Sequence, residues 1–187
     1  MNNKNFPYIF LIFLSLLLSC TENYNPKPLG YFRIDLSKKT YSIFNSNCSF
    51  NFLRASDTKI IQDKNDCWFN IEYPRHNATI HLTYKTFNTN LDNIIEESHK
   101  LAYEHAVKSD GIIEKEYRND KSRVYGILYD IHGNSASNLQ FFVTDSTNYF
   151  LRGSLYFNTI PNSDSLQPIK QYIKEDLQVL IESLKWI

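Results

Sequence analysis

Alternation of apolar and polar residues predicts several β-strands along the chain. Between residues 48 and 53, the apolar positions Phe50 and Phe52 alternate with polar ones, which is the period of a strand with one buried face. Residues 68–73 and 79–86 are also rich in strand-forming residues, and the sequence Pro-Arg-His-Asn between them is typical of a turn. We therefore expect these two segments to form a β-hairpin.

A second group of strands is expected later in the chain. It covers residues 112–117, 124–131, 136–145 and 149–158. Short polar turns separate these segments, and successive strands joined in this way favour an antiparallel meander. Asp145-Ser146 falls in one of the turns, where both side chains can bond nearby backbone N–H groups. A short extended segment is also expected at residues 31–34.

Apolar residues at spacings of three and four predict two helices. The first follows Thr89 and has one apolar and one charged face. The second begins at a cap formed by Asp164 or Ser165. Pro168 is expected in its first turn, where the missing N–H does no harm, and its apolar stripe continues to Leu184. Because both stripes must be buried, we expect a single α+β domain, with an antiparallel sheet packed with two main helices.

The N-terminus carries a different pattern. Lys4 precedes an apolar run from Tyr8 to Leu18, which is too short for a bilayer core of about 20 residues but typical of a secretion signal. The run ends in Leu-Leu-Ser-Cys, which resembles the lipobox at which a lipoprotein signal is cleaved before a lipidated cysteine. We predict a lipoprotein signal peptide over residues 1–19 and lipidation of Cys20; the alternative is an ordinary cleaved signal with an incidental cysteine.

Residues 20–29 have the composition of a tether. Charged residues are sparse there, and Pro26 and Pro28 favour an extended chain that cannot build a core. Acyl chains on Cys20 would hold the protein at a membrane. Residues 30–187 then have the length of one ordinary domain.

The charge of the chain argues against a nucleic-acid partner. It contains 20 basic and 20 acidic residues and no block of five or more basic residues. A nucleic-acid-binding protein carries a basic patch or stripe, so we expect no nucleic acid among the partners.

Cys48 and Cys67 are the two cysteines that remain after Cys20. The compartment outside the inner membrane permits disulfides, and an even count of two favours a pair. Closing this ring would stabilise the fold by about 3 kcal/mol. Two buried free thiols are the alternative, and a catalytic cysteine lacks a convincing histidine partner in the sequence.

Motifs for catalysis or cofactor binding are missing from the sequence. It has no glycine-rich phosphate loop, no Gly-x-Ser-x-Gly and no His-Glu-x-x-His. His99 and His105 lie six residues apart on the predicted helix, which turns them away from each other. Gly126, Gly133 and Gly153 indicate turns, bulges or close packing of strands. We therefore expect no enzyme activity, no cofactor and no metal site.

Several segments of the mature chain resemble one family. They are YNPKPLGYFRI at 24–34, YEHAVK at 103–108, VYGI at 124–127, the dense stretch TDSTNYFLRGSLYFNTIPNSDSLQP at 144–168, and SLKW at 183–186. These segments are similar to the gliding-motility lipoprotein family GldD of Bacteroidetes. The resemblance covers essentially the whole mature chain.

The resemblance implies a non-enzymatic accessory or assembly role in gliding motility and in the linked type IX protein secretion machinery. The implied partners are the membrane, through the N-terminal lipid, and other envelope proteins of the gliding and type IX secretion machinery. Surface-exported lipoproteins of this phylum usually carry an acidic run after the cysteine, whereas residues 21–25 contain one acidic residue. We expect an outer-membrane anchor facing the periplasm, with the inner membrane as the alternative.

Two other functions remain open at this point. One is a periplasmic module that binds a small ligand or glycan through a tyrosine-lined face such as Tyr125 and Tyr129, and the other is a hydrolase with a dispersed site. For the assembly role, the resemblance directs attention to a partner surface composed of Arg33, Arg152 and the loop residues Asn158, Asn162 and Asp164.

Overall fold

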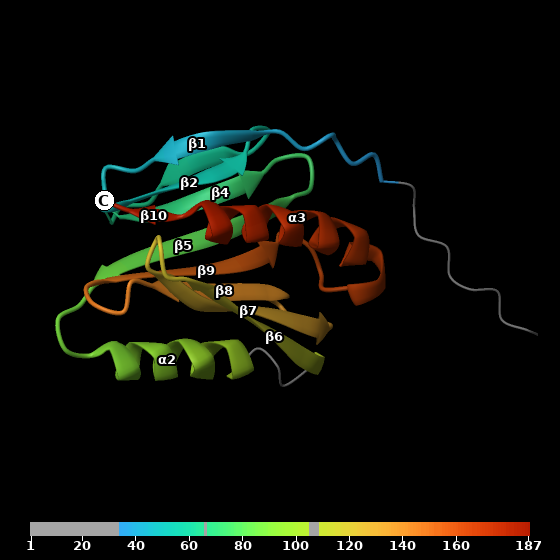
Figure 1. Cartoon of the computed structure of the whole chain (residues 1–187). Helices are drawn as coiled ribbons and strands as arrows, with labels where there is room; N and C mark the ends of the chain where they lie inside the picture. Colours follow the sequence, from blue (N-terminus) through green and yellow to red (C-terminus); the bar gives the residue numbers. More distant parts are fainter. Residues whose placement is uncertain (1–33, 66, 105–108) are drawn as a thin grey trace, which may run out of the picture. The chain divides into compact units, whose positions relative to one another are not determined.

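The computed structural model describes residues 34–65, 67–104 and 109–187. These residues form ten strands and two helices (Figure 1). The strands are β1 (Tyr41–Asn45), β2 (Phe50–Ala55), β3 (Lys59–Gln62), β4 (Trp68–Tyr73), β5 (Ala78–Thr86), β6 (Ser109–Asn119), β7 (Val124–Gly133), β8 (Leu139–Thr144), β9 (Tyr149–Phe157) and β10 (Lys185–Trp186). The helices are α2 (Leu91–Glu104) and α3 (Ser163–Ser183). The predicted α+β fold with two main helices is confirmed.

Seven of the strands form one antiparallel sheet, called the large sheet below, in the order β3-β4-β5-β9-β8-β7-β6. Strands β6 to β9 pair in succession, as the predicted meander requires, and so do β3 to β5. The two runs are joined by pairing of β5 with β9. This pairing arises because α2 connects β5 to β6 and carries the chain to the far edge, from which the second run returns.

The remaining strands form a small sheet in the order β1-β2-β10. Three strands of the structure, β1, β3 and β10, were not expected from the sequence, and they are only five, four and two residues long. The extended segment expected at residues 31–34 lies mostly outside the described residues, and Ile34 is not part of a strand.

The main core lies between α3, the small sheet and one face of the large sheet. Phe50 and Phe52 of β2 are fully buried there. The apolar stripe of α3 is buried in the same cluster, through Tyr172, Ile173, Leu177, Leu180 and Ile181. The helix and the small sheet therefore cover this face together (Figure 1).

Helix α2 covers the opposite face of the large sheet (Figure 1). It packs on a smaller cluster that contains Tyr129, Ile131, Phe142 and Phe150. Leu91, Ile94 and Ile95 of the helix are only partly buried against this cluster. Within α2, Ser98 and Ala102 are the fully buried residues.

The start of α3 differs from the prediction. Asn162 is the N-cap: its backbone is extended, and its side chain accepts a hydrogen bond from the backbone N–H of Ser165 at 3.2 Å. The expected cap at Asp164 or Ser165 is therefore wrong, because the helix begins earlier, at Ser163. Pro168 accordingly lies inside the helix and not in its first turn, so the carbonyl four residues before it lacks a helical donor.

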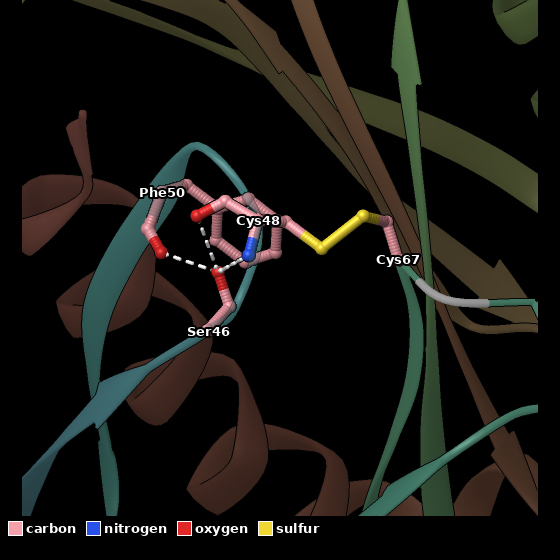
Figure 2. Close-up of a disulfide and its surroundings, with 4 residues drawn as sticks. All are labelled: Ser46, Cys48, Phe50 and Cys67. Atoms are coloured by element: carbon pink, nitrogen blue, oxygen red, sulfur yellow. Dashed lines mark hydrogen bonds between the residues drawn. A yellow bond between two sulfur atoms is a disulfide. The ribbon is translucent and has the colours of Figure 1, made fainter.

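Cys48 and Cys67 are joined by a disulfide, with an S–S distance of 2.05 Å (Figure 2). Cys48 lies between β1 and β2 of the small sheet, and Cys67 directly precedes β4 of the large sheet. Figure 2 also shows the Ser46 hydroxyl, which donates to the carbonyl of Phe50 at 2.6 Å and accepts from the N–H of Cys48 at 3.2 Å. The bond thus links the two sheets next to a hydrogen-bonded turn.

Candidate functional site

The register of the large sheet lines up side chains on the face that carries α2. Trp68 of β4 pairs with Thr83 of β5. Thr83 pairs in turn with Arg152 of β9, and Arg152 pairs with Phe142 of β8. Side chains at paired positions share one face of a sheet, so these residues form a row across four neighbouring strands.

A cleft of about 210 Å³ lies where this row meets the helix. From the helix, Ile94, Glu97 and Leu101 contribute to its wall. From the sheet, Trp68, Lys85 and Arg152 line it. We call this hollow the Arg152 cleft. It combines apolar walls with three charged side chains.

Arg152 is the central polar group of the Arg152 cleft. Its guanidinium is half-buried, and burial lowers the pKa of Arg152 from its ordinary value. The Nη2 atom donates to Oε1 of Gln140 at 2.6 Å. Within the described residues, the guanidinium forms no ion pair with a carboxylate. Because an arginine has five N–H donors, several of them stay available to a ligand.

The other two charges of the cleft partly balance each other. Nζ of Lys85 lies 3.8 Å from Oε2 of Glu97, and both side chains are about half exposed. Such a surface pair contributes little to stability. With Arg152 included, the cleft carries two cations and one anion.

A second row of polar residues lies next to the first. Asn70, His81, Ser154 and Gln140 pair in succession from β4 to β8. Nδ1 of His81 lies 2.7 Å from Oδ1 of Asn70. Gln140 is 1% exposed and Ser154 is 5% exposed. Neither Nε2 of Gln140 nor Oγ of Ser154 has a hydrogen-bond partner in the described part of the chain.

A larger hollow, of about 530 Å³, lies near β10 and is lined by Arg123, Lys185 and Trp186. Its arginine is already used, because Nη2 of Arg123 donates to the carbonyl of Asp145 at 3.2 Å and lies 3.9 Å from the Asp145 carboxylate. The arginine is also more than half exposed. The Arg152 cleft is therefore the better candidate for a binding site.

The structure does not bring the predicted partner residues together on one surface. Arg152 lies on the α2 face of the large sheet, whereas Asn162 caps α3 on the opposite face. Asn158 donates its backbone N–H to the carbonyl of Asn77 and accepts from the Asn77 side chain, both at 2.9 Å. Asp164 lies exposed in the first turn of α3. Cys20 and Arg33 lie outside the described residues.

The tyrosines of the alternative binding face have different environments. Both lie on the α2 face of the large sheet, and Tyr125 lines a hollow of about 350 Å³ beside α2. Tyr129 is 1% exposed, and its hydroxyl lies 2.7 Å from Nδ1 of His99 on α2. Burial raises the pKa of Tyr129 above its ordinary value. Tyr129 supports the helix and is not exposed to a ligand.

Asp176 of α3 is a buried carboxylate that sequence patterns do not reveal. It accepts hydrogen bonds from Nζ of Lys39 at 2.8 Å and from the hydroxyl of Tyr41 at 3.0 Å. Burial raises the pKa of Asp176 above its ordinary value, despite these donors. The only signal in the sequence is that Asp176 occupies a position of the apolar stripe of α3, where an apolar residue would be expected.

Asp130 of β7 is a second buried carboxylate. It pairs with Lys170 of α3 and lies 2.6 Å from Nζ of Lys174, also on α3. Burial alone would raise the pKa of Asp130, but the two lysines outweigh it and lower the pKa below its ordinary value. Asp130 and Asp176 attach α3 to its neighbours, which is a structural role.

Potential metal ligands do not cluster in the described ranges, where no three His, Cys, Asp or Glu side chains come together. His76 is buried, and its ring packs against Tyr172 at a centroid distance of 5.3 Å. His81, as described above, bonds an asparagine. His76, His81 and His99 are thus engaged in packing or hydrogen bonds.

The chain matches the model of a known protein family. A family model described as gliding motility lipoprotein GldD matches residues 21–186 of the chain. No curated protein matched the chain. Neither of the two described helices is both long and apolar enough to cross a membrane.

Proposed function

Because the chain belongs to the GldD family of gliding-motility lipoproteins, we propose that it is a non-enzymatic assembly component of the gliding apparatus and of the linked type IX secretion machinery. As a member of this lipoprotein family, it is a membrane-anchored protein of the cell envelope. The observation that carries the proposal is the extent of the match, which includes all the strands and helices of the described domain. The folded surface, and not only the anchor, is then the part that acts.

We further propose that lipid on Cys20 holds the domain at the periplasmic face of the outer membrane. Two or more acyl chains make anchoring effectively stable. The low number of acidic residues after Cys20 supports retention in the periplasm. Separation of inner and outer membranes on a density gradient, followed by protease treatment of whole cells, tests both statements. Inner-membrane recovery, or digestion in intact cells, would contradict them.

A deletion strain tests the assembly role. We expect cells that lack the protein to lose gliding on agar and to retain type IX cargo inside the cell, with both defects restored by the wild-type gene. The matched variant Cys20→Ala should fail to restore them, because the domain would leave the membrane. Normal gliding and normal secretion after deletion would overturn the proposal.

Controlled expression separates assembly from enzymatic turnover. An enzyme acts repeatedly, so a few copies per cell still process its substrate. A structural component is needed in proportion to the machines that contain it. We therefore expect gliding and secretion to fall in step with the amount of protein, measured by quantitative immunoblotting. Full function at a few per cent of the normal amount would contradict a non-enzymatic role.

The alternative, a module for a small ligand or glycan, gains some support from the Arg152 cleft, which combines an aromatic and a cationic side chain. Its volume of about 210 Å³ is, however, below the roughly 300–1,000 Å³ of most ligand pockets. The cleft is better matched to one or two side chains of a partner protein.

A further inference from the structure

Building on the assembly role above, we propose that the Arg152 cleft binds an acidic peptide segment of a partner protein, with a carboxylate on Arg152 and an adjacent apolar side chain against α2. The cleft would then be the contact through which the domain recognises that partner.

Charge is the first reason. The cleft carries two cations, Arg152 and Lys85, and one anion, Glu97. Glu97 lies 3.8 Å from Lys85, and its charge also acts on Arg152, but in the described residues no carboxylate lies within ion-pair distance of the Arg152 guanidinium. Arginine and carboxylate form two parallel hydrogen bonds of matching geometry. The free N–H donors of Arg152 therefore leave room for a carboxylate supplied by a bound molecule.

Hydrogen bonding holds Arg152 in place at the cleft and leaves unpartnered polar groups next to it. Gln140 already bonds Arg152 through Oε1, yet its Nε2 has no partner. Oγ of Ser154, which is opposite Gln140 in the register, also has none. A buried polar group without a partner is costly. Neither residue lines the cleft, so the donors offered to a bound carboxylate are those of the Arg152 guanidinium, which Gln140 holds through its Oε1.

The apolar walls select what accompanies the carboxylate. Ile94 and Leu101 of α2 face Phe150 and Trp68 of the sheet across the cleft. Trp68 is 37% exposed, so part of its surface is free to contact a bound group. An apolar side chain beside the acidic one would bury this surface. A free inorganic anion would leave it exposed.

Fluorine NMR of the tryptophans tests the proposal directly. The chain has two tryptophans, Trp68 in the cleft and Trp186 in the separate hollow near β10. The lipidated full-length protein is labelled with 5-fluorotryptophan, inserted into phospholipid nanodiscs and titrated with acetyl-Leu-Glu-amide to millimolar concentrations. We expect a saturable shift of the Trp68 signal and a constant Trp186 signal. No shift of Trp68, or an equal shift with acetyl-Leu-Gln-amide, would overturn the proposal.

Three variants and one control refine the test. Arg152→Gln should weaken binding of the acidic peptide by about tenfold or more, and Arg152→Lys by less, because lysine keeps the charge. Glu97→Gln should strengthen binding by about two- to fivefold, since it removes a like charge. A gain of binding cannot be produced by unfolding. Arg75→Gln, at an exposed turn between β4 and β5, should change nothing.

Two further outcomes are informative. An equal response to inorganic phosphate would indicate a general anion site and overturn the peptide proposal. Peptide binding unaffected by Arg152→Gln would do the same. Because the titration uses no motility readout, a failure to bind the peptide would leave the assembly role intact. Normal gliding and secretion in the deletion strain would overturn the assembly role and leave the measured peptide binding in place.

Discussion

At the scale of single residues, Asp145 organises the turn between β8 and β9. Its Oδ1 accepts hydrogen bonds from three consecutive backbone N–H groups. These are the N–H groups of Thr147, at 2.9 Å, and of Asn148 and Tyr149, both at 2.8 Å. Burial alone would raise the pKa of Asp145, but these donors and Arg123 outweigh it, so the pKa lies below its ordinary value of 3.8. The turn therefore depends on a charged carboxylate.

Asp145→Asn removes this charge and keeps an acceptor oxygen. We expect the free energy of unfolding to fall by about 1–2 kcal/mol at neutral pH. Because the folded-state pKa is lowered, the stabilisation is present above the ordinary pKa of 3.8 and is lost as the pH falls through the folded-state value. Urea denaturation of both proteins between neutral and strongly acidic pH measures the difference. A difference that is independent of pH would contradict the role of the charge.

Gly153→Ala tests close packing inside β9. A Cβ at this position would lie 2.2 Å from Cε1 of Phe141, whose ring is 1% exposed and has little room to move. We expect a loss of about 1–3 kcal/mol in unfolding free energy, measured by denaturation. The neighbouring variant Ser154→Ala is the control, because it removes a hydroxyl without a partner and should cost little. Equal effects of the two variants would rule out the steric explanation.

Residue types predicted some of these roles and not others. The turn role of Asp145 was expected from the sequence, and close packing at Gly126 and Gly153 was one of the expected meanings of a glycine in a strand; the structure confirms both. The cap of α3 was misplaced for a simple reason. Every residue from Asn162 to Ser165 is a good N-cap, so residue type alone cannot choose between them.

At the scale of elements, the two helices differ in how firmly they are held. Helix α3 has seven buried residues, including Lys170 and Asp176, and α2 has two. Buried ion pairs and hydrogen bonds also attach α3 to β7 and to residues before β2. Helix α2 depends mainly on partly buried apolar contacts.

Hydrogen exchange should reveal this difference. We expect the backbone amides of α2 to exchange at least about tenfold faster than those in the middle of α3, because local opening of α2 exposes less apolar surface. Exchange followed by mass spectrometry on the full-length protein measures both helices in one sample. Equal protection would show that α2 opens only when the whole domain unfolds.

Element prediction succeeded where the sequence pattern was long. The hairpin of β4 and β5, the strands β6 to β9 and both helices were expected. The strands β1, β3 and β10 were not, because segments of two to five residues carry too few positions to establish a period. The β5–β9 pairing was also missed, since it depends on the path of α2 and not on either strand.

At the scale of the whole domain, the Cys48–Cys67 disulfide joins the small sheet to the large one. The two cysteines lie 19 positions apart in the sequence. Replacing both by serine should lower the free energy of unfolding by about 3 kcal/mol, because the unfolded chain regains the freedom of the open ring. Denaturation of the wild type under reducing conditions should give the same loss. An unchanged midpoint in the double variant would show that the bond contributes nothing.

The Arg152 cleft illustrates why a site is harder to predict than a fold. Its walls come from β4, β5, α2 and β9, so they meet only after the β5–β9 pairing forms. Arg152 itself was selected from a family-like segment, which indicated a residue but not its neighbours. Glu97 and Trp68 carried no signal of their own in the sequence.

The position of β10 has a consequence for the order in which the domain can be completed. Strand β2 lies in the middle of the small sheet, and one of its neighbours is Lys185–Trp186, more than a hundred residues later. A chain exported from its N-terminus would deliver β2 to the far side of the membrane long before this neighbour arrives. Until the last residues cross, one edge of β2 stays unpaired and open to chaperones or to other emerging chains.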